Sequence, residues 1–288
     1  MRQIVIISGK GGTGKTSLSA ALATMGERLM VADCDVDAAN LHLLLEPTDH
    51  SRHPFPTGAK ALIDQQRCTQ CGACMDLCRF DAIRYQEDHY TISETSCDGC
   101  YLCMRICPAD AISMIESNGS YWKTGTFRNG WMVHAQLEPG EENSGKLVNV
   151  VRKQSLQLSE QMGVETILID GPPGTGCPAI SAMSGANLAV LVTEPSRSGF
   201  HDLKRIKQLA DGFDIPSVVV INKYDLNEQV TTEIESWCRS ERLSLIGKIP
   251  FEPAVVEAML QCQSVVEWAP RSAAADEITA IHRQIFQS

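Results

Sequence analysis

The stretch Ser8-Gly9-Lys10-Gly11-Gly12-Thr13-Gly14-Lys15-Thr16 decides the fold of this chain. An apolar run at 4–7 precedes it and Ser17 begins a helix-forming run, so the order is strand, glycine loop, helix. Residues 9–16 fit the phosphate-binding pattern G-x-x-x-x-G-K-[ST], in which glycines let backbone N–H groups surround phosphate oxygens. The pattern predicts a nucleotide site with the Lys15 ammonium at the β- and γ-phosphates and the Thr16 hydroxyl at Mg²⁺.

A second lysine, Lys10, lies inside this loop. The run Lys-Gly-Gly-Thr-Gly-Lys-Thr resembles the deviant Walker A motif of the MinD/ParA/nitrogenase-iron-protein group. In that group the extra lysine reaches across a dimer interface to the nucleotide of the other subunit. The resemblance therefore implies a catalytic role for Lys10 in an ATP-dependent dimer, formed with an identical chain or with a homologous ATPase.

Composition narrows the class of protein. The 288 residues are 43% hydrophobic and 21% charged, which is ordinary for a folded domain with a large core. A net charge of −10 argues against nonspecific nucleic-acid binding, so no nucleic-acid partner is expected. We expect a cytoplasmic protein without a membrane anchor, because no apolar run is long enough to span a bilayer and the chain opens on its first strand. Thiols stay reduced there, so 12 cysteines suggest metal ligands rather than disulfides.

The rest of the chain outside one cysteine-rich region alternates strands with helices. This pattern predicts an α/β fold with a mainly parallel sheet flanked by helices. The expected strands lie at 3–8, 28–32, 166–170, 188–193, 217–221 and 245–249, and a further half-buried strand is expected at 131–137. We expect a proline-rich linker at 46–60, a polar turn at 141–146, and His134 as a strand packing or surface residue.

Three segments at strand ends resemble other parts of the MinD/ParA site. The run beginning Asp33-Cys34-Asp35 looks like switch I, which implies that Asp35 orients the attacking water and helps to organise Mg²⁺. Asp170, before Gly171, looks like Walker B followed by switch II, which implies a water-mediated Mg²⁺ contact. Asn222 resembles the residue that contacts the base; we favour adenine, with guanine as the alternative. The implied nucleotide site consists of Gly9, Lys10, Gly11, Gly12, Thr13, Gly14, Lys15, Thr16, Ser17 and Asn222.

The cysteine-rich region is an internal repeat. Cys68-x-x-Cys71-x-x-Cys74-x-x-x-Cys78 recurs, at one constant offset, as Cys97-x-x-Cys100-x-x-Cys103-x-x-x-Cys107. The repeat resembles a bacterial two-cluster ferredoxin, in which the fourth ligand of each cluster comes from the opposite repeat. The resemblance implies one [4Fe–4S] cluster on Cys68, Cys71, Cys74 and Cys107, and a second on Cys97, Cys100, Cys103 and Cys78. Zinc is the competing interpretation, although zinc sites usually use two ligand pairs. Cys177 is expected to be an unliganded or packed thiol; the alternative is that it exchanges metal or electrons with a partner subunit.

We therefore expect a MinD-like P-loop ATPase domain at 1–60 and 118–288, with a ferredoxin-like domain inserted at 61–117. The leading hypothesis is an ATPase that couples the state of its dimer to electron transfer through two clusters, toward a redox or cluster-accepting protein partner. One alternative is a cluster carrier or scaffold similar to Mrp proteins. The other is a positioning switch like MinD or ParA in which the clusters sense redox state.

Overall fold

The computed structural model describes residues 1–117, 119–139, 141 and 144–286. The chain divides into two compact units, which we treat separately. Unit 1 comprises residues 1–52, 122–135 and 144–288, and unit 2 comprises residues 53–121 and 136–143.

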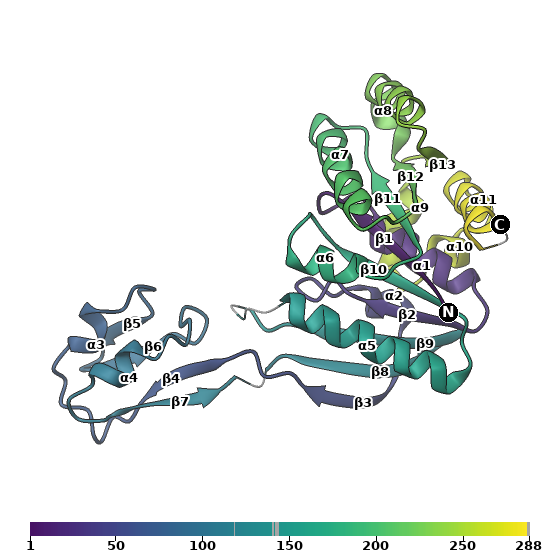
Figure 1. Cartoon of the computed structure of the whole chain (residues 1–288). Helices are drawn as coiled ribbons and strands as arrows, with labels where there is room; N and C mark the ends of the chain where they lie inside the picture. Colours follow the sequence, from purple (N-terminus) through teal and green to yellow (C-terminus); the bar gives the residue numbers. More distant parts are fainter. Residues whose placement is uncertain (118, 140, 142–143, 287–288) are drawn as a thin grey trace. The chain divides into compact units, whose positions relative to one another are not determined.

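A nine-stranded sheet forms the centre of unit 1 (Figure 1), in the order β13-β12-β11-β1-β10-β2-β9-β8-β3. From β13 to β9 all neighbouring strands pair in parallel, which confirms the expected mainly parallel α/β fold. The strands are β1 (Arg2–Ser8), β2 (Leu29–Asp33), β3 (Thr48–Pro54), β8 (Tyr121–Phe127), β9 (Gly130–Gln136), β10 (Thr166–Pro173), β11 (Leu188–Thr193), β12 (Ser217–Asn222) and β13 (Ser244–Ile249).

Helices cover both faces of this sheet, as Figure 1 shows. One face carries α5 (Ser144–Met162), α6 (Cys177–Met183), α7 (Arg197–Gly212) and α8 (Glu228–Ser240). The other carries α1 (Lys15–Met25), α2 (Leu41–Leu45), α9 (Pro253–Leu260), α10 (Val265–Trp268) and α11 (Ala273–Phe286). Because both faces are covered, the central strands are apolar throughout; Ile4 pairs with Leu168 on one side and Leu188 on the other. The carboxyl ends of β1, β2 and β10 thus meet at one edge, where the glycine loop lies.

Unit 2 is small and built from short elements. β4 (Ala59–Ile63) pairs antiparallel with β7 (Ile112–Glu116), and β5 (Ile83–Gln86) with β6 (His89–Ile92). Two short helices, α3 (Ala73–Asp76) and α4 (Leu102–Ile106), lie within the first and second cysteine runs. The buried apolar core comprises Ala61, Ile63, Ile83, Tyr90 and Ile112, and half-buried cysteine side chains pack directly against it. Six of the eight repeat cysteines therefore pack on this core, whereas Cys71 and Cys100 are exposed.

Two sequence expectations outside the site were wrong. Residues 46–60 are not a linker, because β3 and the start of β4 lie there; β3 is polar and mostly exposed at the sheet edge, so it shows no apolar alternation. β9 is a strand as expected, but it is not half-buried: Met132, Val133, His134 and Ala135 are all buried. Of the turn expected at 141–146, residues 142 and 143 lie outside the described residues, and α5 begins at Ser144.

In the part of the chain that the structure describes, no helix combines the length and apolar character needed to cross a bilayer.

Candidate functional site

The glycine loop connects β1 to α1 at the carboxyl edge of the sheet. Gly12 and Gly14 have φ values of +78° and +89°, a conformation that side chains other than glycine rarely adopt. Lys15 starts α1 and is 5% exposed, so its ammonium is held inside the loop. The local sequence thus builds a concave, positively charged turn at a helix N-terminus, which is suited to phosphate.

Asp170, within β10, lies against the first turns of α1. Its Oδ2 accepts a hydrogen bond from the Thr16 hydroxyl at 2.9 Å, and its Oδ1 accepts one from Ser19 at 2.6 Å. Burial raises the pKa of Asp170 to about 6, although the charge of Lys15 and the two hydroxyl donors act to lower it. This carboxylate is therefore held at the Thr16 hydroxyl, where the sequence expected Mg²⁺.

Two more carboxylates meet Asp170 at the end of β2. The backbone N–H of Asp35 donates to Asp33 Oδ1 at 3.2 Å, while Asp33 Oδ2 is buried with no hydrogen-bond partner among the described residues. Burial and the charges of Asp170 and Asp35 raise the pKa of Asp33 well above its ordinary value. Burial likewise raises the pKa of Asp35, with Lys15 opposing the shift.

This acidic cluster fits Mg²⁺ bound in its usual way. Mg²⁺ prefers oxygen ligands and keeps several waters, so it binds through one or two carboxylates together with substrate phosphates. The orphaned Asp33 oxygen and the Asp170–Thr16 pair supply oxygen atoms without crowding the loop. A cation here would also relieve the mutual repulsion of the buried carboxylates.

Lys10 is directed to its own chain. Its ammonium lies 2.6 Å from Glu194 Oε1 and donates to the hydroxyls of Ser196 and Ser198, each at 3.1 Å. Burial acts to raise the pKa of Glu194, but contacts with Lys10 and Lys223 outweigh it and the pKa is lowered. In this state the lysine is bound to the segment between β11 and α7.

Asn222, at the end of β12, supports the glycine loop. Its Nδ2 donates to the carbonyl of Thr13 at 2.8 Å, and its Oδ1 accepts from the backbone N–H of Lys223 at 3.0 Å. The Lys223 ammonium donates to the carbonyl of Gly12 at 3.1 Å and lies 3.4 Å from Glu194. The structure thus gives Asn222 and Lys223 a role in holding the loop that sequence reasoning missed.

In unit 2 the eight repeat cysteines line two separate cavities. One is lined by Cys68, Cys71, Cys74 and Cys107 together with Ile63, Tyr90 and Pro108. The other is lined by Cys78, Cys97, Cys100 and Cys103, and Cys74 also borders it. The structure therefore brings together the same two groups of four that the ferredoxin resemblance implied.

The cysteine side chains of the two cavities are not arranged around a single metal ion. Among the described residues, no group of three or more His, Cys, Asp or Glu side chains is placed to hold a single metal ion. A [4Fe–4S] cluster has a different requirement, because its four thiolates bind four different irons and stand around a cube. Four cysteines around one apolar cavity fit that donor arrangement.

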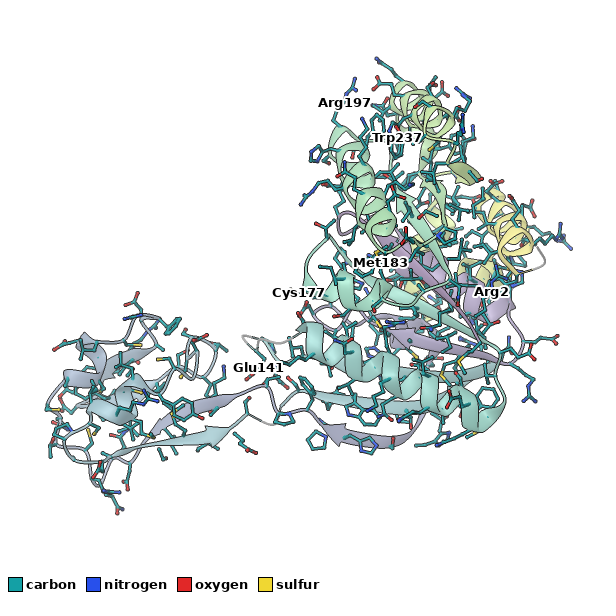
Figure 2. The ribbon with its side chains drawn as sticks, viewed as in Figure 1. Arg2, Glu141, Cys177, Met183, Arg197 and Trp237 are labelled. Atoms are coloured by element: carbon teal, nitrogen blue, oxygen red, sulfur yellow. The ribbon has the colours of Figure 1, made fainter. Side chains whose placement is uncertain are left out.

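Cys177 and Cys34 are not among the repeat cysteines. Cys177, labelled in Figure 2, is exposed at the start of α6. Cys34 is fully buried between two site aspartates, so burial strongly raises its pKa and the thiol stays protonated.

The sequence analysis missed two site residues, Ser19 and Glu194. Ser19 could have been predicted from the sequence, because it lies one helical turn after Lys15 on α1.

Comparison with known proteins agrees with this geometry. The family model described as the CobQ/CobB/MinD/ParA nucleotide binding domain matches residues 4–265. An uncharacterised protein of Methanocaldococcus jannaschii is 36% identical over 228 residues, which cover 78% of this chain and 79% of that protein.

Two solved structures share the fold. The septum site-determining protein MinD of Pyrococcus horikoshii, complexed with Mg-ADP, aligns with a TM-score of 0.61 at 22% identity, covering 99% of this chain and 96% of that one. The cell division ATPase MinD of Pyrococcus furiosus aligns with a TM-score of 0.59 at 23% identity, covering 99% and 98%.

Proposed function

Because the chain belongs to the CobQ/CobB/MinD/ParA nucleotide-binding family, we propose that it binds and hydrolyses Mg²⁺-ATP as a dimer and thereby controls electron transfer through two [4Fe–4S] clusters. The observation that carries the electron-transfer part is the pair of cavities in unit 2, one lined by four cysteines and the other by five, with Cys74 bordering both. We assign the ATPase domain to residues 1–60 and 118–288 and the ferredoxin-like domain to residues 61–117; the compact unit 2 extends beyond this insert, to residues 53–121 and 136–143.

The chemistry of the nucleotide site follows from its side chains. Lys15 neutralises charge at the β- and γ-phosphates, and the backbone N–H groups of the glycine loop bind phosphate oxygens. Thr16 and Asp170, which are hydrogen-bonded to each other, would hold Mg²⁺, and the ion would neutralise charge on the phosphates. Asp35, at the carboxyl edge of β2, orients the attacking water. Asn222 keeps one N–H for the base beyond the bond that it gives to Thr13, and adenine is the base that we propose.

Lys10 connects nucleotide binding to dimer formation. To reach a nucleotide on a partner subunit, it must first leave Glu194, Ser196 and Ser198. ATP favours the dimer because its γ-phosphate offers the ammonium a stronger anionic partner than a single carboxylate. The dimer is formed by identical chains, or by this chain and a homologous ATPase.

Unit 2 has the properties of a domain that depends on a bound group. Its buried core is small, and domains of this size usually need metals or disulfides for stability. When bound, [4Fe–4S] clusters accept and release single electrons. The chain's own contribution is to hold the eight thiolates, to shield them with apolar side chains such as Ile63 and Ile83, and to present Cys71 and Cys100 at the surface. A redox or cluster-accepting protein is the proposed partner.

A second candidate function is favoured by the comparison structures, which are named as cell-division MinD proteins. In this alternative the chain is a positioning switch, and the cysteine unit senses redox state. The two proposals differ in one property: a switch changes its location or partner with nucleotide, whereas the electron-transfer ATPase changes the rate of electron transfer to an acceptor.

The test is anaerobic reconstitution of the full chain with iron and sulfide. The proposal predicts about eight iron atoms per chain, four for each cluster, and ATP hydrolysis that requires Mg²⁺. It also predicts that electron transfer from the reduced protein to a small dye acceptor changes when ATP is added. Stoichiometric zinc in place of iron would overturn the cluster part. Iron binding with electron transfer indifferent to nucleotide would instead favour the redox-sensing switch.

A further inference from the structure

Lys60, on β4, is fixed against one of the two cysteine loops. Its ammonium donates to the carbonyl of Cys97 at 2.9 Å. The same strand lies tightly on this loop at Gly99, where a Cβ would lie under 3.0 Å from the Ala59 carbonyl oxygen. Lys60 is therefore a fixed positive charge beside the cavity lined by Cys78, Cys97, Cys100 and Cys103.

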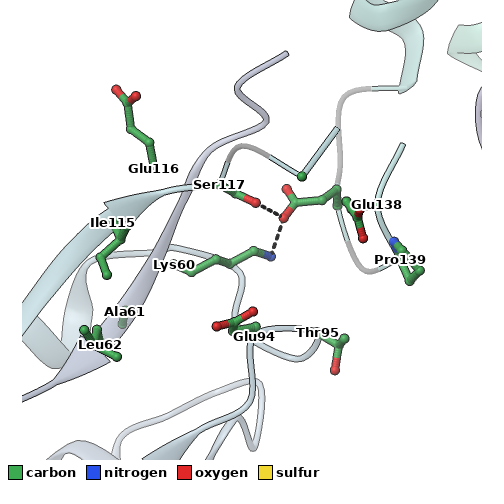
Figure 3. Close-up of a pocket in the computed structure, with 12 residues that line it drawn as sticks. Lys60, Ala61, Leu62, Glu94, Thr95, Ile115, Glu116, Ser117, Glu138 and Pro139 are labelled. Carbon is green, nitrogen blue, oxygen red and sulfur yellow. Dashed lines mark hydrogen bonds and ion pairs between the residues drawn. The ribbon is translucent and has the colours of Figure 1, made fainter. Parts of the chain in front are cut away.

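Glu141 holds Lys60 from the other side. Its Oε1 lies 3.5 Å from the Lys60 ammonium and accepts a hydrogen bond from Ser117 at 2.5 Å, while Oε2 accepts one from Thr57. The side chains of Lys60 and Glu141 are 16% and 7% exposed, so water screens the pair only weakly. Figure 3 shows the Lys60 ammonium and the Ser117 hydroxyl directed at the same carboxylate.

Lys60 is a single positive charge among acidic side chains. An open cavity of about 450 Å³ beside the pair is lined by four glutamates, Glu94, Glu116, Glu138 and Glu141. Among its described lining residues, Lys60 is the one cation. A charge change at Lys60 is therefore not compensated by another lysine or arginine in the lining.

We propose that the Lys60–Glu141 pair sets the reduction potential of the cluster held by Cys78, Cys97, Cys100 and Cys103, an inference that rests on the proposed function. Reduction adds one negative charge to the cluster. A nearby ammonium favours that charge and raises the potential, whereas a carboxylate opposes it. Lys60 and Glu141 are positioning residues that act through their fields, not ligands.

The experiment is anaerobic redox titration of the reconstituted full chain, with each cluster followed by electron paramagnetic resonance. K60M is expected to lower the midpoint potential of one cluster by about 59 mV, a tenfold change in the equilibrium constant of its reduction. E141Q is expected to raise the same midpoint, and the K60M/E141Q double variant to return toward the parent value. A Cys107→Ser variant removes a proposed ligand of the other cluster. The resonance signal that remains in this variant therefore belongs to the cluster whose midpoint potential K60M is expected to change.

Arg84→Gln is the matched control, because it removes one positive charge from an exposed position on β5 of the same unit. It is expected to leave both midpoints unchanged. Equal movement of both clusters in K60M, or movement of neither while iron content stays at about eight per chain, would overturn this inference and leave the proposed function standing. Failure of the parent chain to assemble clusters would overturn both.

Discussion

The ammonium of Lys10 lies 2.6 Å from the carboxylate of Glu194, on the segment that follows β11 of the same chain. Both side chains are only partly exposed, at 26% and 22%. The lysine that distinguishes this glycine loop is thus already bound within its own subunit, so a contact with a partner's nucleotide requires exchange of one anionic partner for another.

The first prediction concerns this exchange. E194Q removes the internal competitor and is expected to strengthen dimer formation with a non-hydrolysable ATP analogue by up to about fivefold, the equivalent of a partly exposed ion pair worth about 1 kcal/mol. Sedimentation velocity with and without the analogue measures the effect. E233Q, which removes the carboxylate that pairs with exposed Arg197, is the control and should leave association unchanged. Weaker association in E194Q would mean that Glu194 supports the dimer instead of restraining Lys10.

The second prediction separates the two lysines of the loop. K15A is expected to weaken ATP binding by about tenfold to hundredfold, because it deletes a charged hydrogen bond to phosphate. K10A is expected to bind ATP normally and to lose ATP-dependent dimerisation and most hydrolysis. Equilibrium binding of a fluorescent ATP analogue, together with phosphate release, distinguishes them. Equal loss of binding in both variants would contradict a role for Lys10 across the interface.

The third prediction compares a glycine of the loop with one outside it. Gly14 has φ of +89°, and a Cβ there would lie under 3.0 Å from Asn222 Nδ2. G14A is therefore expected to break the Asn222–Thr13 bond and to weaken ATP binding at least about tenfold, since strain and the lost bond each cost about 1 kcal/mol or more. Gly212, at the end of α7, has nothing within 4 Å of its Cβ position, so G212A is the control and should bind within about twofold of the parent.

These loop contacts show what the sequence could and could not predict. The strands and the glycine loop are local patterns, and β11 was predicted at its observed bounds, Leu188–Thr193. The Asn222–Thr13 hydrogen bond joins residues 209 positions apart in the sequence. No local pattern around either residue predicts that they are partners. β3 escaped prediction because an exposed edge strand of polar residues has no apolar period to detect.

The candidate cluster site was more accessible to sequence reasoning than the nucleotide site. The grouping of Cys107 with the first run and Cys78 with the second was implied by the resemblance of the repeat to two-cluster ferredoxins, and the same cysteines line the two cavities. By contrast, Lys60 and Glu141 are unremarkable in sequence, since only folding brings β4 beside Cys97 and the segment before α5 beside Lys60. Charges that act through space leave no local pattern.

The fourth prediction concerns pH. His134 stacks on His42 with ring centroids 5.2 Å apart, and its Nε2 lies 3.0 Å from Asp49. Burial lowers the pKa of His134, outweighing Asp49, and burial together with His134 and Lys123 lowers the pKa of His42. Both rings are therefore neutral in the folded protein at neutral pH, and the Asp49 carboxylate accepts a hydrogen bond from the neutral His134 ring. Unfolding frees both rings to take up protons below about pH 6.5.

The free energy of unfolding should accordingly be highest above that pH and fall as pH drops through it. Anaerobic urea unfolding at about pH 7.5 and about pH 5.5 measures the loss. H134Q is expected to lose less stability between these pH values than the parent chain. An equal or larger loss in H134Q would show that other groups dominate the acid response.

The fifth prediction tests the cysteine assignment. C107S is expected to reduce the reconstituted iron content from about eight atoms per chain to about four, because it removes one ligand of a four-cysteine set. C177S is the control; this exposed cysteine lies outside both cavities, so about eight irons should remain. Retention of full iron content by C107S, or loss of half of it by C177S, would require a different set of ligands.

The central claim is that nucleotide and cluster state are energetically coupled. The most direct measurement is anaerobic redox titration of both clusters in the full chain without nucleotide, with ADP, and with a non-hydrolysable ATP analogue. Coupling predicts that the ATP analogue shifts at least one midpoint by tens of millivolts, where about 59 mV is a tenfold change for one electron. By linkage, the same factor must separate the affinities of the oxidised and reduced protein for the analogue. Two intact clusters with identical midpoints in all three states, and equal nucleotide affinity in both redox states, would contradict the account.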